Sequence, residues 1–457
     1  MTVVAPLTRQ LAEFVSTLAG RGTLPESVRA VVRLGFTDTI GSMFTGIDEP
    51  VTIALRRVLE AEGGTRESRA CLSAHRMTAS QAAFLTATAG HAIDLDDYAF
   101  NNHPSVVLVP TILALADAVG GDGARMAAAY AAGYEAWAGV MMREADSLHG
   151  KGWHPTAILG PLGATVAAAV MLGLDETRCQ HAIALAASCS GGVMANFGTM
   201  GKPLHAGRAA QAGVLNARLA AAGMEASAEA LESPRGLMAA LSPRGNVDRT
   251  TGFERLGQDW AIDRFRLNIK KYPTVGVTQR TIDAVAKLGA RERFDLAAIR
   301  AIDSVISVRQ SALMPYRRPT TALEAKFSLE FAVAATLLRG TVGIAELTDT
   351  FVGRPDVQRL VGLVRRVETD EADPTHPESA PADFVTLHFA DGTALQSEKI
   401  WRATGHADNP LDVEGVWRKF RDCSKAIQLP EERAHELFER LQAIDLLGSA
   451  AELPTLS

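Results

Sequence analysis

The densest group of side chains able to exchange protons or bind a cation lies between residues 91 and 103. Three carboxylates, a phenol and an imidazole follow one another there: Asp94, Asp96, Asp97, Tyr98 and His103. If the helix that begins near residue 79 runs through this segment, Asp94 and Tyr98 share a face, and Asp96 and Asp97 point elsewhere. A proline follows His103 and suits the first turn of a second helix, which would place His103 at a helix N-terminus, where anions are attracted.

The same segment allows two other interpretations. Acidic side chains often solvate or cap the end of a helix, with no catalytic role. A Mg²⁺ or Zn²⁺ site is the second alternative, but no second histidine stands four residues from the first and no cysteine accompanies them. We therefore predict that the protein binds no metal.

Two further motifs combine glycine or proline with a basic side chain. His154 precedes a proline at the start of a long apolar stretch, where an imidazole could meet an anion, move a proton or simply bond a backbone carbonyl. Lys202 stands between a glycine and a proline, with His205 shortly after it, and only nine of the 46 basic residues are lysines. A confined lysine can orient a carboxylate, or act as a base once burial lowers its pKa.

Lysine, tyrosine and arginine recur in two later motifs. Lys270 and Lys271 precede a Tyr-Pro pair where the sequence texture changes, at an expected domain seam, although paired lysines are also typical of a solvated turn. In the second motif, Tyr316 could deliver a proton while Arg317 or Arg318 clamps a carboxylate.

The elements that must position these residues begin with a long helical region. Up to about residue 260, apolar residues recur at helical spacing between glycine and proline boundaries. The range 156–172 is apolar on nearly every side and should lie in the middle of a helical domain. The predicted helices include 11–18, 28–44, 79–92, 107–119, 124–142, 156–172, 176–187 and 206–222.

The pattern changes after residue 265. Alternating residues predict strands at 302–308 and 364–368, and a hairpin of 384–389 with 393–400 around an Asp-Gly turn. Between them the range 322–338 keeps a helical pattern. These elements are typical of a small α+β domain.

We therefore predict a mainly α protein, with a large all-helical domain and a smaller α+β lid domain. The predicted limits are 1–265 for the first part of the helical domain, 266–398 for the lid, and 399–457 for a C-terminal part that returns to the helical domain. Helices are expected at 411–420 and 431–446 in that last part.

Composition excludes several classes of function. A net charge of −6 and a pI near 6.0 argue against a nucleic-acid partner. The four cysteines show no C-x-x-C spacing, which argues against a disulfide framework, a zinc site or an iron–sulfur cluster. No export signal is visible in residues 1–11 and no uninterrupted apolar run is long enough to cross a bilayer, so we expect a cytoplasmic protein with no membrane partner.

In their order along the chain, these motifs resemble the MmgE/PrpD family. They are G-H-A-x-D-x-D-D with H-P-S, W-H-P-T-A, G-T-M-x-K-P-L-H-A-G-x-A-A, K-x-Y-P and Y-x-R-P-T-T-x-L-E-A-K-F-S. The resemblance implies a homodimer whose active site lies between a large helical domain and an α+β lid. It implies six catalytic side chains: Asp94, His103, His154, Lys202, Lys270 and Tyr316. Tyr98 departs from the small polar residue that the family often carries, which leaves the shape of the pocket open.

The family includes 2-methylcitrate dehydratases, cis-aconitate decarboxylases and iminodisuccinate epimerases, which all build negative charge next to a carboxylate. The resemblance therefore implies a cofactor-independent enzyme that abstracts a proton beside a carboxylate of a small di- or tricarboxylic acid. We expect dehydration of the 2-methylcitrate type first, epimerisation and then decarboxylation as alternatives, and a non-enzymatic polycarboxylate-binding protein as the rival class. The side chains expected to contact substrate are Tyr98, His205, Lys271, Arg317 and Arg318.

Overall fold

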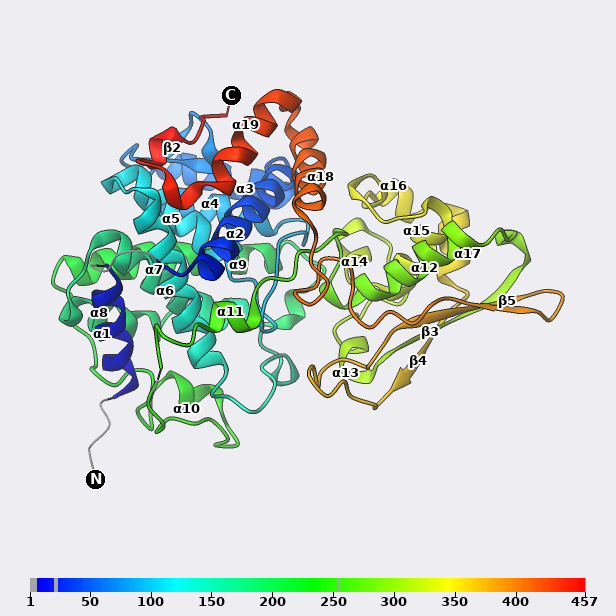
Figure 1. The fold of residues 1–457 in the computed structure, drawn as a ribbon, viewed down its shortest axis with the longest axis horizontal. Coiled ribbons are helices and arrows are strands. Elements are labelled where there is room, and N and C mark those ends of the chain that lie inside the picture. The colour runs from blue at the N-terminus through cyan, green and yellow to red at the C-terminus, as the bar shows by residue number, and fades with distance from the viewer. Residues whose placement is uncertain (1–5, 20–23, 254, 457) are drawn as a thin grey trace.

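The computed structural model describes residues 6–19, 24–253 and 255–456, which form a large helical part and a smaller part built on a sheet (Figure 1). The main hydrophobic core runs from Leu7 to Ile269 and resumes at Val416, while a second core spans Tyr272 to Leu387. This architecture confirms the predicted mainly α fold with a smaller α+β part.

The large part is a bundle of helices around one apolar element. It contains α1 (Leu7–Ala19), α2 (Glu26–Gly46), α3 (Pro50–Glu62), α4 (Ala79–His91), α5 (Ser105–Val119), α6 (Gly123–Met141), α7 (Pro155–Leu172), α8 (Glu176–Ala186), α9 (Gly201–Ala221), α10 (Leu237–Leu241), α11 (Ala261–Phe265) and the short strands β1 (Ser68–Arg69) and β2 (Arg76–Met77). As the sequence predicts, α7 lies in the middle, packed against α5, α6, α8 and α9. Among the described residues, α7 alone is long and apolar enough to cross a membrane, yet 94% of it is buried inside the protein.

Local signals set the ends of the helices that carry the candidate residues. Thr78 and Gln81 form a capping box at the start of α4. At α7, His154 is the residue before the helix and Pro155 the first helical residue, as predicted, and the helix stops at Gly173 in a left-handed conformation. His154 is therefore fixed at the N-terminus of a buried helix.

The smaller part is a four-stranded sheet in the order β4-β3-β5-β6, with helices packed on one face (Figure 1). Its strands are β3 (Ile299–Ser307), β4 (Val364–Thr369), β5 (Phe384–Phe389) and β6 (Ala394–Gln396), and its helices are α12 (Gln279–Arg291), α13 (Val308–Ser311), α14 (Ala322–Ala325), α15 (Leu329–Arg339), α16 (Asp349–Val352) and α17 (Pro355–Val361). The predicted strands and hairpin are confirmed, because β5 and β6 pair antiparallel across the Asp-Gly turn.

One predicted helix is divided in two. The range 322–338 forms α14 and α15, separated at residues 326–328, because Ser328 caps α15 by accepting the backbone N–H of Phe331. Lys326 and Phe327 lie in the turn between the two helices, and both side chains contact the large part.

The C-terminal segment returns to the large part, as predicted. Helices α18 (Val413–Ser424) and α19 (Glu431–Gln442) pack on α2 (Figure 1). Lys419 of α18 donates to Asp38 of α2 at 2.5 Å and to the backbone oxygen of Leu95 at 2.8 Å. The end of the chain thereby helps to hold the segment that follows α4.

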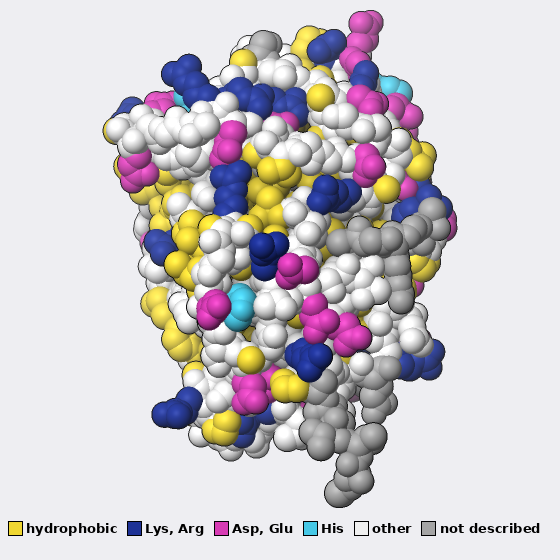
Figure 2. Space-filling view, turned by 90° about the vertical axis from the view of Figure 1, so that its left-hand side faces the viewer, with side chains coloured by type: hydrophobic (Ala, Val, Ile, Leu, Met, Phe, Trp, Pro, Cys, Tyr) yellow, Lys and Arg dark blue, Asp and Glu magenta, His cyan; other side chains and the backbone are white. Residues whose placement is uncertain are grey.

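The fold does not test the expected cytoplasmic location or the expected lack of nucleic-acid and membrane partners. The expected lack of an export signal depends on residues 1–11, of which 1–5 lie outside the described residues. On the end of the large part, Lys and Arg alternate with Asp and Glu over the described surface (Figure 2). The absence of a nucleic-acid partner and of a membrane partner stay predictions.

A buried carboxyl in α6 should make the stability of the protein depend on pH. Glu135 accepts the backbone N–H groups of Ala261 and Ile262, both at 2.9 Å, and burial raises its pKa from 4.5 to about 7. Between these values the unfolded chain binds fewer protons than the native state, so this contribution to stability falls as pH rises. The free energy of unfolding of the wild type should fall between about pH 5 and pH 8. In Glu135→Gln this fall should be smaller by roughly 2 to 4 kcal/mol, measured by urea denaturation. Glu371→Gln at an exposed position is the control, and equal slopes for wild type and Glu135→Gln would contradict the prediction.

Candidate active site

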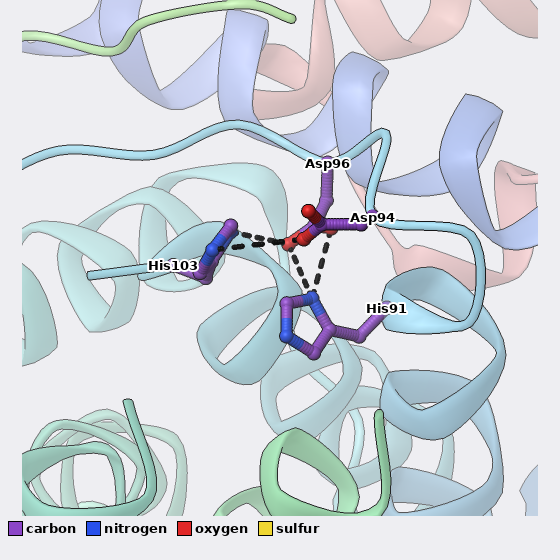
Figure 3. A group of neighbouring side chains, drawn as sticks. All are labelled: His91, Asp94, Asp96 and His103. Carbon is purple, nitrogen blue, oxygen red and sulfur yellow. Dashed lines mark hydrogen bonds and ion pairs between the residues drawn. The ribbon is translucent and has the colours of Figure 1, made fainter. Parts of the chain in front are cut away.

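The segment after α4 is a tight turn, so the helix ends close to the predicted limit at residue 92, and the condition under which Asp94 and Tyr98 would share a helix face does not hold. Helix α4 ends at His91, and Asp94 adopts a left-handed backbone conformation with φ of 59°. Aspartate tolerates this conformation better than most residues, but it still carries strain and often marks a functional site. Because the chain turns here, Asp94 and Asp96 both face the same cluster, whereas a continuous helix would separate them (Figure 3).

Asp94 joins two lysines that are far apart in the sequence. Its Oδ1 accepts from Nζ of Lys202 at 2.6 Å and pairs with Nζ of Lys270 at 2.9 Å. Lys270 also donates to the backbone oxygen of Asp94 at 2.9 Å. Lys202 lies in the first turn of α9 and Lys270 in the segment that joins the two parts, so Asp94 gathers both at the seam.

Burial and charge act against each other in this group. Burial would raise the pKa of Asp94, but the charges of Lys202 and Lys270 outweigh it and hold the pKa well below its usual range. Burial lowers the pKa of Lys202, and the Asp94 carboxylate opposes this shift. In the described part of the chain, Oδ2 of Asp94 has no hydrogen-bond partner.

Asp96 connects two imidazoles to this group (Figure 3). Its two oxygens lie 2.9 and 3.0 Å from Nδ1 of His91, and Oδ2 lies 2.9 Å from Nδ1 of His103. Nε2 of His91 lies 2.8 Å from Nζ of Lys202, and Nε2 of His103 lies 4.0 Å from Oδ1 of Asp94. Asp96 would point away only if the helix continued, and because the helix ends at His91, Asp96 faces the cluster.

His154 and His205 form the neighbouring wall of the cluster. Their Nδ1 atoms lie 3.1 Å apart, so one of them donates to the other. The ring of His154 stacks on that of His91 at 5.9 Å between centroids, and Phe197 packs edge-on against His154 at 5.1 Å. Burial holds the pKa of His154 well below its usual range, which favours the neutral ring.

Two tyrosines approach the cluster from the seam. Tyr316 of the smaller part donates to the backbone oxygen of Phe197 at 2.8 Å, and its ring lies so close to Gly198 that a Cβ there would clash at 2.3 Å. The ring of Tyr98 lies 6.0 Å from Nζ of Lys270, and burial raises the pKa of Tyr98 to about 12. Both phenols border the lysine and histidine cluster without bonding to it.

Three of the predicted site residues lie outside the cluster. Arg317 and Arg318 are exposed, and Arg317 pairs with Glu330 and Glu368 of its own domain. Lys271 is also exposed and pairs with Asp283 at 3.7 Å. In these two motifs, Tyr316 and Lys270 face the large part, whereas Arg317, Arg318 and Lys271 do not.

Sequence reasoning assigned no role to three residues that the fold brings to this region. His91 and Asp96 complete the hydrogen-bonded cluster, although both stand inside a motif quoted for the family resemblance. Lys326, in the turn between α14 and α15, donates to the backbone oxygen of Ala92 at 3.0 Å and is 4% exposed. The signal that the sequence offered for Lys326 was a lysine next to Phe-Ser inside a predicted helix.

The cluster also has the composition of a cation site. His91, Asp94, Asp96 and His103 each offer a ligand atom, and these atoms lie within 4.8 Å of one another. The ammonium of Lys202 already contacts both Asp94 and His91, so a divalent ion there would meet a fixed positive charge. The expectation of no metal stays a prediction.

Comparison with known proteins identifies the family. The MmgE/PrpD N-terminal domain matches residues 9–250, and the MmgE/PrpD C-terminal domain matches residues 272–443. The chain belongs to the MmgE/PrpD family. Asp94, His103, His154 and Lys202 lie in the first match and Tyr316 in the second, whereas Lys270 lies between the two.

The curated relatives of this MmgE/PrpD protein include three cis-aconitate decarboxylases. The mouse (Mus musculus) protein is 29% identical over 76% of this chain and 72% of its own length. The human (Homo sapiens) protein is 27% identical over 83% of this chain and 80% of its own length. The Aspergillus terreus protein is 25% identical over 82% of this chain and 79% of its own length. The similarity therefore extends over both domains of the MmgE/PrpD fold.

Proposed function

We propose that the protein is a lyase that acts on a small di- or tricarboxylic acid, and that decarboxylation of a cis-aconitate-type tricarboxylate is its reaction. The observation that carries the proposal is the pair of buried lysines, Lys202 and Lys270, that share the single carboxylate of Asp94 next to His103. Relatives that match over most of their length are cis-aconitate decarboxylases, which favours loss of CO₂ over loss of water.

The balance of charge in the cluster suits an anionic substrate. Two ammonium groups meet one Asp94 carboxylate, and the remaining carboxylate, Asp96, is occupied by two imidazoles. A substrate carboxylate that binds Lys202 and Lys270 would supply the missing negative charge. Charge that develops beside that carboxylate would then be stabilised by cations already in place.

The proposed reaction needs one bond cleavage and one proton transfer. The carbon–carbon bond to the leaving carboxylate breaks, CO₂ departs, and the electron pair passes into an enolate-like system that bears a remaining carboxylate. Lys202 and Lys270 stabilise that charge, and a proton is delivered to carbon by an acid at the site. The imidazole of His103 is the proposed carrier of this proton, because its Nε2 is the ring nitrogen that faces the lysines and Asp94.

Access to the cluster requires the seam to open. Asp94, His154, Lys202 and Lys270 are each less than 5% exposed. Two contacts from the smaller part close the seam: Tyr316 to the backbone of Phe197, and Lys326 to the backbone of Ala92. We expect these contacts to break and form again as substrate enters and product leaves.

Proton NMR in D₂O with a set of small di- and tricarboxylates tests the proposed function. Loss of one carbon from cis-aconitate, with deuterium incorporated into the product, is the expected result. A new vinyl signal with all carbons kept would instead indicate the dehydratase that the motifs first suggested, and deuterium exchange in an unchanged skeleton would indicate an epimerase. Calorimetric binding of these acids without turnover of any of them would indicate a binding protein. A homodimer and a cytoplasmic location stay predictions.

We expect His103→Ala to lower kcat by about two to four orders of magnitude, because the variant loses the proposed proton carrier. The substrate found in the NMR screen serves for the measurement, under saturating conditions. His435→Ala on the exposed face of α19 is the matched control and should keep wild-type turnover. A His103→Ala variant that turns over at the wild-type rate would remove His103 from the proposed mechanism.

A further inference from the structure

The carboxylate of Asp96 lies between two imidazoles and contacts the Nδ1 atom of each. Nδ1 of His91 lies 2.9 and 3.0 Å from its two oxygens, and Nδ1 of His103 lies 2.9 Å from Oδ2 (Figure 3). Asp96 itself is fully buried. Burial would raise the pKa of Asp96, but the two imidazoles outweigh it and hold the pKa well below its usual range, which keeps the group an acceptor.

The contacts of His103 define which of its nitrogens carries the proton. Nδ1 lies 2.9 Å from the backbone oxygen of Asp97 as well as from Asp96. A carbonyl oxygen can only accept a hydrogen bond, so Nδ1 must be the donor. In the neutral ring, Nε2 then holds the lone pair, and this atom faces Oδ1 of Asp94 at 4.0 Å.

The contacts of His91 lead to the same tautomer by a different route. Its Nδ1 faces only the Asp96 oxygens, while its Nε2 lies 2.8 Å from Nζ of Lys202. An ammonium can only donate, so Nε2 must accept and Nδ1 must carry the proton. Burial lowers the pKa of His91 to about 3, which keeps the ring neutral and the acceptor available.

We propose that Asp96 and His91 are positioning residues: Asp96 holds His91 as its Nδ1–H tautomer and lies beside the Nδ1–H of His103 that the backbone oxygen of Asp97 accepts, and Nε2 of His91 holds the Lys202 ammonium toward Asp94. The consequence for the reaction rests on the proposed function, in which Lys202 acts as a cation and His103 as a proton carrier. Asp96 and the backbone oxygen of Asp97 thus leave Nε2 of His103 free to take up a proton from water and to deliver it to the substrate carbon.

Nitrogen-15 NMR of histidine-labelled protein tests the tautomers without reference to activity. Two-bond couplings from the ring protons distinguish a protonated Nδ1 from a protonated Nε2. Signals of His91 and His103 are assigned by their loss in His91→Asn and His103→Ala. We expect both rings to be Nδ1–H tautomers in the wild type, and an Nε2–H tautomer for either ring would overturn the proposal. This result does not depend on which substrate the enzyme uses, so its failure and the failure of the proposed function are distinguishable.

Two substitutions of His91 separate its two contacts. In His91→Asn the side-chain amide can still donate to Asp96 but is too short to reach Lys202, whereas in His91→Gln an oxygen can accept from Lys202. Loss of that acceptor destabilises the ammonium form and lowers the pKa of Lys202. We therefore expect the alkaline limb of kcat/KM to move to lower pH in His91→Asn and kcat to fall roughly 10- to 100-fold, with most of both effects reversed in His91→Gln.

A merely structural role would lower the melting temperature of both variants and leave the pH profile in place. An alkaline limb in His91→Asn that coincides with the wild type would overturn the proposal, and so would a His91→Gln variant as impaired as His91→Asn. His435→Asn, at an exposed position that contacts Glu439 at 4.0 Å, is the control and should match the wild type in both rate and profile.

Discussion

Replacing Lys202 by methionine should reduce kcat by about 100- to 1,000-fold, because the side chain keeps its length but loses the charge aimed at the developing anion. We expect the fold to survive this change. Asp94 keeps Lys270 at 2.9 Å, and removal of one of two neighbouring ammonium groups relieves their repulsion. Single-turnover kinetics and thermal denaturation measure the two effects separately.

The control for this substitution is Lys425→Met, since Lys425 is exposed and its ammonium pairs with the nearby Asp422. Lys202→Arg is the informative companion. It keeps the positive charge, but a planar guanidinium cannot take the place of a compact ammonium between Asp94 and His91, so activity should stay low. Wild-type turnover in Lys202→Met would disprove the proposed role of this lysine.

Replacing Asp94 by asparagine should have the second large effect, on stability as well as on turnover. Lys202 and Lys270 would lose the carboxylate that compensates both buried charges, and removal of one partner from a buried ion pair typically costs about 3 to 5 kcal/mol. Turnover should fall as well, because neither lysine is then held toward the substrate. We expect kcat to fall by about 100-fold or more.

The pH dependence of this variant distinguishes lost charge compensation from a simple packing defect. Without Asp94, the native pKa of Lys202, which burial already lowers, falls further below the unfolded value near 10.4. Between these values the unfolded chain binds more protons, so the stability of Asp94→Asn should rise with pH more steeply than that of the wild type. Urea denaturation between about pH 7 and pH 9 measures it, with Asp370→Asn at an exposed position as control. A deficit that does not change with pH would point to packing alone.

The fold class could be predicted because it depends on patterns of short range. The residues of α7 are apolar on nearly every side, so the burial of this helix follows from its composition. The strands around the Asp-Gly turn alternate between apolar and polar residues, as expected for a half-buried sheet. The single helix predicted at 322–338 was wrong, because the cap of Ser328 competes with an otherwise unbroken helical pattern.

The sequence predicted which residues belong to the candidate site better than it predicted how they are arranged. Asp94, His103, Lys202 and Lys270 could be named from their motifs, and the structure brings all four together. Arg317 and Arg318 lie outside the cluster in this structure, and a motif does not say which of its side chains faces the seam.

By itself, the sequence determined the family, the helical part with its smaller α+β part, and the residue types available for proton transfer and carboxylate binding. Only the tertiary structure decided that Asp96 and His91 belong to the cluster. The reason is that a turn with a left-handed Asp94 reverses the directions that a helix would impose. Contacts between residues as distant as His91 and Lys202 depend on how α4 and α9 pack, and no local pattern encodes that arrangement.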